Sequence, residues 1–392
     1  MFRYRLGIEE EYFVVDRKTR NVRRVMPRKF FRACKTDLGE RVTTELLQSQ
    51  IEVSTSPCAT VAEARAQIGR FRTILAGHAA RYGLAIAAAA THPLAAWREQ
   101  KQTEKDRYDA VMSDIQMLGL RNMLCGMHVH VEVPDPARRV ELMYRSVPFL
   151  PLLLALSTSS PFWQGQRTGL LGYRLAAYDE LPRTGLPEPF RTTAEYQRYV
   201  DTLVAAGVIK DASFIWWSIR PSLWYPTLEL RIADVCTRLE DAVCIAAIHR
   251  CLVRHLVDHP EINCELDAVD RALAEENKWR AQRYGTAATF VDRGSAAKPI
   301  KAAVEELLEL IRDDAEALDC ADEIRHAHEI VRRGSSANEQ VRIYARARIA
   351  RRSRTQALKE VVDWLCQTTV RTELARSRAP PSDIPEALRA KW

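Results

Sequence analysis

The feature that most constrains the fold is the strict alternation of side-chain type along 127–133. Apolar side chains occupy the odd positions, whereas His128, His130 and Glu132 occupy the even ones. Successive side chains of a β-strand point to opposite faces, so the pattern predicts a strand with one buried face and one polar face. Imidazole is a metal ligand and a hydrogen-bond donor to phosphate, so the polar face is a candidate ligand site. As an alternative, His130 or Glu132 lies beyond the site.

A second candidate strand, 4–15, carries three consecutive glutamates. Glu9 and Glu11 fall on one face of this strand, and Glu10 falls on the other. Two neighbouring carboxylates raise each other's pKa unless a cation lies between them. The pattern therefore indicates metal binding, with an exposed acidic edge strand as the alternative.

A third strand is predicted over 48–54, where Gln48, Gln50 and Glu52 share one face. A row of two amides and a carboxylate suits hydrogen bonding to a polar ligand or to metal-bound water. We therefore expect the two glutamines to contact substrate. An ordinary half-solvated strand is the alternative interpretation of the same pattern.

A fourth strand, 227–234, carries Glu229 and Arg231 together on the face opposite its apolar residues. The two side chains could form a salt bridge on the surface of the sheet. In a site for metal and phosphate, the carboxylate would hold the cation and the planar guanidinium would bind phosphate. A fifth strand, 84–90, is apolar throughout.

If these strands are neighbours, their polar faces form a floor rich in carboxylates. Oxygen-rich sites of this kind prefer Mg²⁺ or Mn²⁺ to Zn²⁺. The chain has no Gly-x-x-x-x-Gly-Lys loop and no Gly-x-Gly-x-x-Gly after a strand. A nucleotide would therefore be held through metal ions and arginines. The arginines that would supply positive charge to a nucleotide or a carboxylate substrate are Arg174, Arg220 and Arg231.

The two parts of the chain differ in organisation. Up to about residue 235, the predicted strands alternate with helices such as 60–82 and 108–118. From about residue 238, nearly every segment is helical, namely 239–258, 265–285, 298–317, 322–333 and 338–366. No repeat or flexible linker separates the parts. We therefore predict an α+β fold in a single catalytic domain, 1–392, in which the helical part, 238–392, packs on the sheet and flanking helices of 1–237.

Composition excludes several classes of protein. The 392 residues are 47% apolar with a net charge of +7, which excludes disorder and a nucleic-acid-binding arm. The longest apolar run, 147–156, contains two prolines and is too short to cross a membrane. The nine cysteines include no Cys-x-x-Cys pair, so buried free thiols are expected. With no signal peptide expected, we predict a soluble, cytoplasmic protein without nucleic-acid or membrane partners.

Five motifs occur in the same order as in one family of enzymes. They are Gly7-Ile8-Glu9-Glu10-Glu11, the pair Glu45 and Glu52, Gly126-Met127-His128-Val129-His130, Ile219-Arg220-Pro221-Ser222 with Thr227-Leu228-Glu229-Leu230-Arg231, and Asn277-Lys278-Trp279-Arg280-Ala281-Gln282-Arg283-Tyr284-Gly285. Over about residues 4–370, the chain resembles the bacterial carboxylate–amine ligases of glutamate–cysteine ligase family 2. The resemblance implies a glutamine-synthetase-like fold, in which the concave face of an antiparallel sheet holds Mg²⁺ ions and ATP.

The resemblance also implies roles for individual residues. The positions that match metal ligands are Glu9, Glu11, Glu45, Glu52, His128 and Glu229. Arg231 matches an arginine that contacts the transferred phosphoryl group, and Glu229 is expected to act beside it in catalysis. Thr91 and His92 match a motif near the substrate, with a strand-ending turn as the alternative. We also expect His130 to contact substrate.

The chain departs from the family pattern at two places. Ser218 stands where an acidic residue is expected before Ile219, and 335–340 is an altered version of a Gly/Asn/Gln stretch. These departures concern the identity of the substrate more than the fold. The arginine-rich segment 342–354 is open to three interpretations: a solvated or salt-bridged helix face, a contact for a nucleotide or acidic substrate, or a nucleic-acid contact.

The sequence therefore predicts an ATP-dependent ligase that joins a carboxylate to an amine. ATP would phosphorylate the carboxylate, and the amine would then displace phosphate from the acyl phosphate. By the resemblance, glutamate and cysteine or a related amino acid or amine are the substrates, so the partners are small molecules, and a homodimer is compatible with the sequence. A divalent-metal-dependent hydrolase and a nucleotide- or metal-binding protein without turnover are the alternatives.

Overall fold

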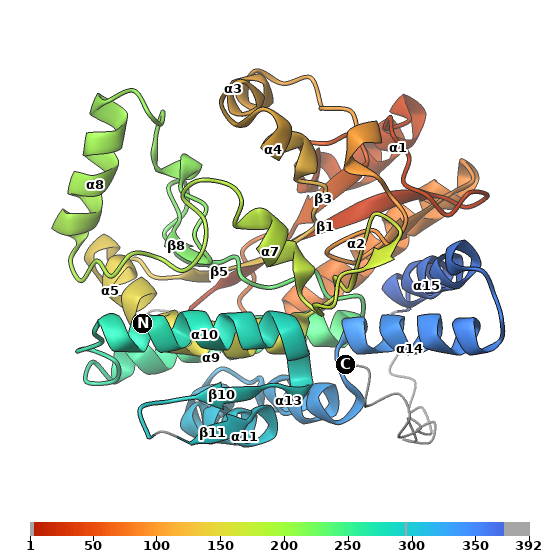
Figure 1. Ribbon diagram of the computed structural model, residues 1–392. Helices are drawn as coiled ribbons and strands as arrows, with labels where there is room; N and C mark the ends of the chain where they lie inside the picture. Colours follow the sequence, from red (N-terminus) through yellow and green to blue (C-terminus); the bar gives the residue numbers. More distant parts are fainter. Residues whose placement is uncertain (1–3, 295, 372–392) are drawn as a thin grey trace.

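A seven-stranded antiparallel sheet forms the centre of the protein (Figure 1). The computed structural model describes residues 4–294 and 296–371. The strand order is β2-β3-β1-β5-β9-β8, and β4 also pairs with β1. These strands are β1 (Leu6–Asp16), β2 (Val42–Thr44), β3 (Gln50–Ser54), β4 (Leu84–Ala87), β5 (Met127–Glu132), β8 (Ile219–Pro221) and β9 (Thr227–Leu230). Because β1 lies in the middle of the sheet, the alternative of an exposed acidic edge strand is excluded.

The predicted strands are all present, some of them shorter than expected. The strand expected over 48–54 begins at Gln50, because residues 48 and 49 form a turn. The prediction that Gln48 lies on the same strand as Gln50 and Glu52 is therefore wrong. The short strands β2 and β8 lack enough residues for alternation to reveal them.

The register of the sheet brings the predicted polar residues together across strands. The paired positions are Glu11 with Glu52, Glu9 with His128, His130 with Glu229, and Arg220 with Glu229. Directly opposed residues share one face of a sheet. The other face belongs to the core, where Ile8, Val53 and Val129 are buried.

Helices cover the apolar face of the sheet. Helix α2 (Val61–Arg81) packs against β1 and β4, α9 (Leu239–Asp258) packs against β5, and the two helices contact each other. α2 begins at Thr60, whose side chain accepts a hydrogen bond from the N–H of Glu63. Helix α9 has the bounds predicted from the sequence, and nearly all of its residues are buried.

The helical part of the chain contacts the sheet and the core helices. Helix α13 packs on α9, α14 packs on α15, and α15 packs on β4 (Figure 1). The helices of this part are α10 (Ala268–Tyr284), α11 (Ile300–Leu310), α12 (Arg312–Ala317), α13 (Ala321–Arg333), α14 (Ser336–Ile349) and α15 (Arg354–Thr369). The single helix predicted over 338–366 is instead two helices, α14 and α15. The segment that connects them turns at Arg351, which has a φ of 59°. The full extent of the predicted domain, 1–392, stays a prediction.

The remaining elements surround the polar face and the core. They are α1 (Arg28–Leu38), α3 (Asp106–Ile115), α4 (Met117–Arg121), α5 (Pro136–Ser146), α6 (Leu150–Ser157), α7 (Tyr173–Tyr178), α8 (Thr193–Ala205), and the hairpins β6 (Phe162–Trp163) with β7 (Gln166–Arg167) and β10 (Thr289–Val291) with β11 (Ala297–Pro299). The predicted helix 108–118 is divided at Gln116, which has a φ of 49°. The hairpin of β10 and β11 interrupts the part of the chain expected to be helical.

One segment of the described residues, Pro136–Ser157, is long and apolar enough to cross a membrane. Within its most apolar window, 83% of the residues are buried inside the protein, so the core accounts for their apolar character.

All nine cysteines are free thiols. In the arginine-rich segment, Arg342 and Arg346 pair with Glu339, and Arg352 pairs with Glu360. These pairs favour the salt-bridged helix face among the three interpretations of that segment.

Candidate active site

Three glutamates come together on the polar face of the sheet. Glu11 lies on β1, Glu52 lies on β3, and Glu45 follows β2. Burial, and after it the nearby Glu45, raises the pKa of Glu11 to about 8 and the pKa of Glu52 well above its usual range. Carboxylates gathered in this way are stable only if they share protons or a cation. Their oxygen atoms are the ligands that Mg²⁺ and Mn²⁺ prefer, so the cluster fits a divalent cation.

A second group of candidate ligands lies beside the first. Glu9, His128 and Glu229 each offer one ligand atom, and these atoms lie within 4.8 Å of one another. Glu9 Oε2 lies 3.1 Å from His128 Nδ1, and its Oε1 lies 3.5 Å from His130 Nε2. Burial, and after it the nearby Arg231, lowers the pKa of His128 to about 4. The ring is therefore neutral at pH 7, and no described residue hydrogen-bonds its buried Nε2. A neutral imidazole between carboxylates fits a metal ion.

Glu229 lies between two arginines. Arg220 Nε is 2.7 Å from its Oε2, and Arg231 Nη1 is 2.5 Å from its Oε1. Burial favours the protonated carboxyl, but the two guanidinium groups outweigh it and hold the pKa of Glu229 well below its usual range. Arg231 also donates a hydrogen bond of 3.3 Å to the hydroxyl of Tyr178. The predicted pairing of Glu229 with Arg231 is confirmed, and the three groups carry a net positive charge that would attract phosphate.

Arg174, on α7, lies directly against Gly126. Its Nη1 donates to the carbonyl oxygens of Arg231 and Ala233, at 3.3 Å each. A Cβ atom on Gly126 would lie 2.3 Å from Arg174 Nη2, so only glycine leaves room for the guanidinium. The N–H of Gly126 donates to Glu11 Oε2 at 2.7 Å. The glycine of this motif therefore connects an arginine and a glutamate of the site.

One pocket, named the Arg174 pocket, opens beside these groups. Six of the predicted site residues line it, namely Glu11, Glu45, Gln50, His128, Arg174 and Arg231, together with side chains of α3, α7 and several connecting segments. The lining residues are Glu11, Glu45, Leu46, Gln50, Tyr108, Val111, Ile115, Asn122, Leu124, His128, Arg174, Tyr178, Leu181, Trp216 and Arg231. Gln50 donates to the carbonyl oxygen of Leu124 at 2.5 Å.

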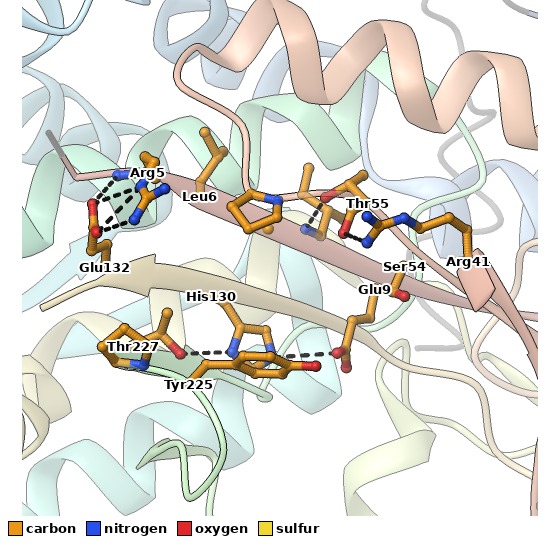
Figure 2. Close-up of a pocket in the computed structure, with 14 residues that line it drawn as sticks. Arg5, Leu6, Glu9, Arg41, Ser54, Thr55, His130, Glu132, Tyr225 and Thr227 are labelled. Carbon is orange, nitrogen blue, oxygen red and sulfur yellow. Dashed lines mark hydrogen bonds and ion pairs between the residues drawn. The ribbon is translucent and has the colours of Figure 1, made fainter. Parts of the chain in front are cut away.

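A second pocket, named the Tyr225 pocket, is shown in Figure 2. Glu9 and His130 line it, whereas Glu11 and His128 line the Arg174 pocket. The Tyr225 ring meets the His130 ring edge-on at 5.8 Å, and His130 Nδ1 lies 2.8 Å from the hydroxyl of Thr227. Along β1 and along β5, side chains that are two residues apart on the polar face therefore line different pockets. The carboxylate-rich row lies between them.

Some predicted substrate contacts lie elsewhere. Thr91 is buried and donates to the carbonyl oxygen of Phe162 at 2.7 Å. His92 is fully buried, and its Nδ1 accepts from the N–H groups of Leu94 and Ala95. Burial lowers the pKa of His92 to about 3. Neither side chain lines either pocket, so the structure favours the strand-ending turn for both. Gln48 donates to the carbonyl oxygen of Gln102, outside both pockets.

The altered stretch 335–340 has a structural role. The hydroxyl of Ser335 lies 2.7 Å from that of Thr158, and Gln340 donates to the carbonyl oxygen of Ser159 at 2.9 Å. These bonds attach α14 to the segment after α6. Ser218, the other departure from the family pattern, is buried, and no described residue hydrogen-bonds its hydroxyl.

Several residues of the site could not be identified from the sequence. Tyr178 contacts Arg231 from α7, and Asp179 at the end of that helix pairs with Lys278 at 2.7 Å. Lys278 belongs to the motif 277–285, which was the signal in the sequence that could have identified it. In the structure its side chain is buried, and a buried lysine needs an acidic partner. Trp216 lies just before β8, and nothing in the sequence pattern indicates that it lines a pocket.

A sheet face that combines clustered carboxylates with arginines is expected for an enzyme that binds phosphate groups through divalent cations. Residues 5–364 match the model of glutamate–cysteine ligase family 2. A protein of Rhodospirillum rubrum named "Putative glutamate--cysteine ligase 2" is 47% identical over 96% of this chain and 98% of its own length. A protein of the same name from Bradyrhizobium diazoefficiens is 46% identical over 96% of this chain and 87% of its own. The chain therefore belongs to glutamate–cysteine ligase family 2, a family of ATP-dependent ligases, as its motifs predict.

Two solved structures share the fold. Glutamate–cysteine ligase from Francisella tularensis, solved in complex with AMP, has a TM-score of 0.69 at 11% identity and covers 100% of this chain and 92% of that one. A bifunctional glutathione synthetase from Pasteurella multocida has a TM-score of 0.65 at 13% identity over 93% of this chain. This chain spans about half of that protein, since the match covers 52% of it. The likeness confirms the predicted α+β, glutamine-synthetase-like fold.

Proposed function

We propose that the protein forms an amide bond of the γ-glutamyl type between a carboxylate and an amine, with ATP and Mg²⁺ or Mn²⁺. Glutamate and cysteine, or a related amino acid or amine, are the proposed substrates. The observation that carries the proposal is the row of carboxylates between two pockets, with Arg231 and Arg174 beside it. Membership of a ligase family supports it. The unit proposed to act is one catalytic domain, 1–392.

The chemistry requires activation of the carboxylate, because carboxylates do not react directly with amines. A carboxylate oxygen attacks the γ-phosphorus of ATP, which gives an acyl phosphate and ADP. The amine nitrogen then bonds to the acyl carbon as the bond from that carbon to the phosphate oxygen breaks. Overall, R–COO⁻, R′–NH₃⁺ and ATP⁴⁻ give the amide, ADP³⁻, HPO₄²⁻ and H⁺. No covalent enzyme intermediate is needed, so the nine cysteines have no assigned role.

Each polar group of the site has a task in this reaction. The residues proposed to hold the cations are Glu9, Glu11, Glu45, Glu52, His128 and Glu229. Bound divalent cations would neutralise phosphate charge during transfer. Arg231 faces the transferred phosphoryl group, and Arg220 holds Glu229 in position. Arg174 binds a carboxylate of the substrate by its planar guanidinium.

The two pockets suit different ligands. The Arg174 pocket offers two guanidinium groups and suits the carboxylate substrate. The Tyr225 pocket offers an aromatic ring and Arg41, which suits the nucleotide. On this proposal His130, expected to contact the amino-acid substrate, contacts the nucleotide side. The free thiols agree with a reducing, cytoplasmic location, and a homodimer stays a prediction.

The test of the function is a hydroxylamine-trapping assay. Hydroxylamine reacts with an acyl phosphate to give a hydroxamate, and it needs no side-chain pocket. With ATP, Mg²⁺ and glutamate or a related carboxylate, we expect hydroxamate in equal amount to ADP. ADP release that is independent of both carboxylate and nucleophile would support a hydrolase instead. Nucleotide binding without any ADP release would support the protein without turnover.

Replacing Gly126 with alanine is expected to lower kcat/KM for the carboxylate by about 100-fold. The added Cβ would displace the guanidinium of Arg174, and misplacing a binding group by about 1 Å has a cost of this size. The measurement is steady-state hydroxamate formation. Gly77→Ala is the matched control, because a Cβ on Gly77 meets no atom within 4 Å. Equal kcat/KM values for the two variants would show that the position of Arg174 does not matter.

A further inference from the structure

The Arg174 pocket has two kinds of wall. The wall formed by the sheet and α7 carries the charged groups already described. The remaining wall is apolar and comes from three separate segments. Its residues are Val111 and Ile115 on α3, Leu181 after α7, and Trp216 before β8.

These four side chains lie outside the main hydrophobic cluster, although Ile115 and Leu181 are themselves buried, at 8% and 7% exposed. The core cluster of the described residues, together with the partly buried side chains packed against it, includes none of Val111, Ile115, Leu181 and Trp216. Apolar side chains in a fold are ordinarily explained by the core that they pack into. For this group the shared feature is instead the pocket that they line.

The orientation of α3 supports the same conclusion. Tyr108, Val111 and Ile115 are spaced three and four residues apart, so they share one face of the helix, and that face lines the pocket. The polar residues Asp109 and Asp114 of the same helix are exposed. The helix therefore presents its apolar face to the pocket and its polar face to water.

Trp216, on the segment before β8, is held in place by contacts of its backbone and of its ring. Its backbone N–H donates to the carbonyl oxygen of Arg183 at 2.8 Å, and the Arg183 guanidinium lies over the indole ring at 5.4 Å. Phe214 contacts the same ring at 6.0 Å. A fixed aromatic ring provides apolar contact area without much loss of side-chain entropy on binding.

Four side-chain atoms of the residues that line the pocket have no hydrogen-bond partner among the described residues, namely Gln50 Oε1, Asn122 Oδ1, His128 Nε2 and Arg231 Nε. The side-chain oxygen of Asn122 is buried, and no described residue donates to it. A buried acceptor of this kind is costly unless a donor reaches it. An amine supplies N–H donors that this oxygen can accept.

We propose that the amine substrate carries an aliphatic or aromatic side chain, which binds against Val111, Ile115, Leu181 and Trp216. This inference rests on the proposed ligase function. In the proposed function, Arg174, Arg231 and the residues that hold the cations bind the charged ends of the carboxylate substrate. The apolar wall is therefore left for the amine. The amino group points to the side-chain oxygen of Asn122, and the side chain of the amine contacts the four apolar residues.

The test compares, in the same assay, amines whose side chains differ in size and polarity. Glycine, serine, cysteine, valine, leucine and phenylalanine are offered with ATP, Mg²⁺ and the carboxylate that gives hydroxamate, and the dehydrated product is measured by mass. We expect kcat/KM for leucine or phenylalanine to exceed that for serine and cysteine by about tenfold or more, as each apolar group buried in a fitting pocket contributes on that scale. Hydroxamate formation with equal or higher kcat/KM for serine or cysteine would overturn the inference and leave the ligase proposal intact. Absence of hydroxamate and ADP with every carboxylate would contradict the ligase proposal itself.

A nearly isosteric variant tests the wall directly. Val111→Thr keeps the shape of the side chain and puts a hydroxyl into the apolar wall. The ratio of kcat/KM for leucine to that for hydroxylamine should fall by about tenfold. Ser113→Ala, on the exposed face of the same helix, is the matched control and should leave the ratio unchanged. Trp216→Ala, from a different segment, should lower the ratio further. An unchanged ratio in both wall variants would overturn the inference.

Discussion

Replacing Glu9 with glutamine is expected to lower Mg²⁺-dependent ADP release by at least about 100-fold. The substitution keeps the size of the side chain and removes a charge that, with His128 and Glu229, is positioned to hold a cation. Since the loss is one of cation affinity, a higher Mg²⁺ concentration should recover part of the rate. The measurement is a Mg²⁺ titration of ADP release by the variant and the wild type.

Arg231→Lys provides the contrast to this variant. Lysine keeps the positive charge but loses the planar, two-pronged contact with a phosphoryl group. Its lower rate should therefore not respond to excess Mg²⁺. Glu40→Gln is the matched control, because the Glu40 side chain is 94% exposed and, among the described residues, pairs only with Lys35 at the surface. A wild-type Mg²⁺ dependence in Glu9→Gln, or rescue of Arg231→Lys by Mg²⁺, would contradict the assigned roles.

Most of the carboxylates of the site could be predicted because they lie on strands, whereas Glu45, which follows β2, was assigned only by the resemblance. A period of two assigns each side chain to a face from the sequence alone, so Glu9, Glu11, His128 and Glu229 could be grouped without coordinates. The order and register of the strands could not be obtained in this way. The pairing of Glu9 with His128 depends on contacts between segments more than 100 residues apart, and the resemblance to a family indicated only that both residues match metal ligands.

Arg174 was a candidate from the sequence, but its position in the pocket and the apolar wall could not be predicted, for a different physical reason. Arg174, Leu181 and Trp216 lie on short helices and connecting segments, where no periodicity relates side chains to a face. Their positions depend on tertiary contacts, such as the bond from Lys278 to Asp179 after α7. The break of a predicted helix at Gln116 is of the same kind, since neither glycine nor proline marks it.

Glu10 was correctly assigned to the face opposite Glu9, but its environment could not be foreseen. In the structure its side chain is completely buried, and so is that of Arg72 on α2. Arg72 donates to both carboxylate oxygens of Glu10, at 2.9 and 2.6 Å. The same guanidinium donates to the carbonyl oxygens of Cys236 and Thr237, at 2.8 and 2.9 Å. One arginine thus connects β1 to the segment that leads into α9.

Replacing Arg72 with methionine is expected to lower the free energy of unfolding by about 3–5 kcal/mol. Methionine fills much of the space but leaves the Glu10 carboxylate buried without its cation, and it removes the hydrogen bonds to the backbone carbonyl oxygens of Cys236, Thr237 and Thr369. The measurement is urea denaturation followed by tryptophan fluorescence. Adding Glu10→Gln to Arg72→Met should recover part of the loss, because the buried charge is then removed.

The matched control is Arg20→Met, because Arg20 also pairs with a single carboxylate, that of Asp363 on α15, at 2.9 Å. Both of these side chains are more than a third exposed, so the pair is screened by water and should contribute only about 0–1 kcal/mol. The two variants therefore separate burial from ion pairing as the source of stability. If Arg72→Met and Arg20→Met shift the urea midpoint equally, burial of the Glu10 charge is not what makes Arg72 necessary. If the double variant is less stable than Arg72→Met alone, the unpaired carboxylate is not the cause of the loss.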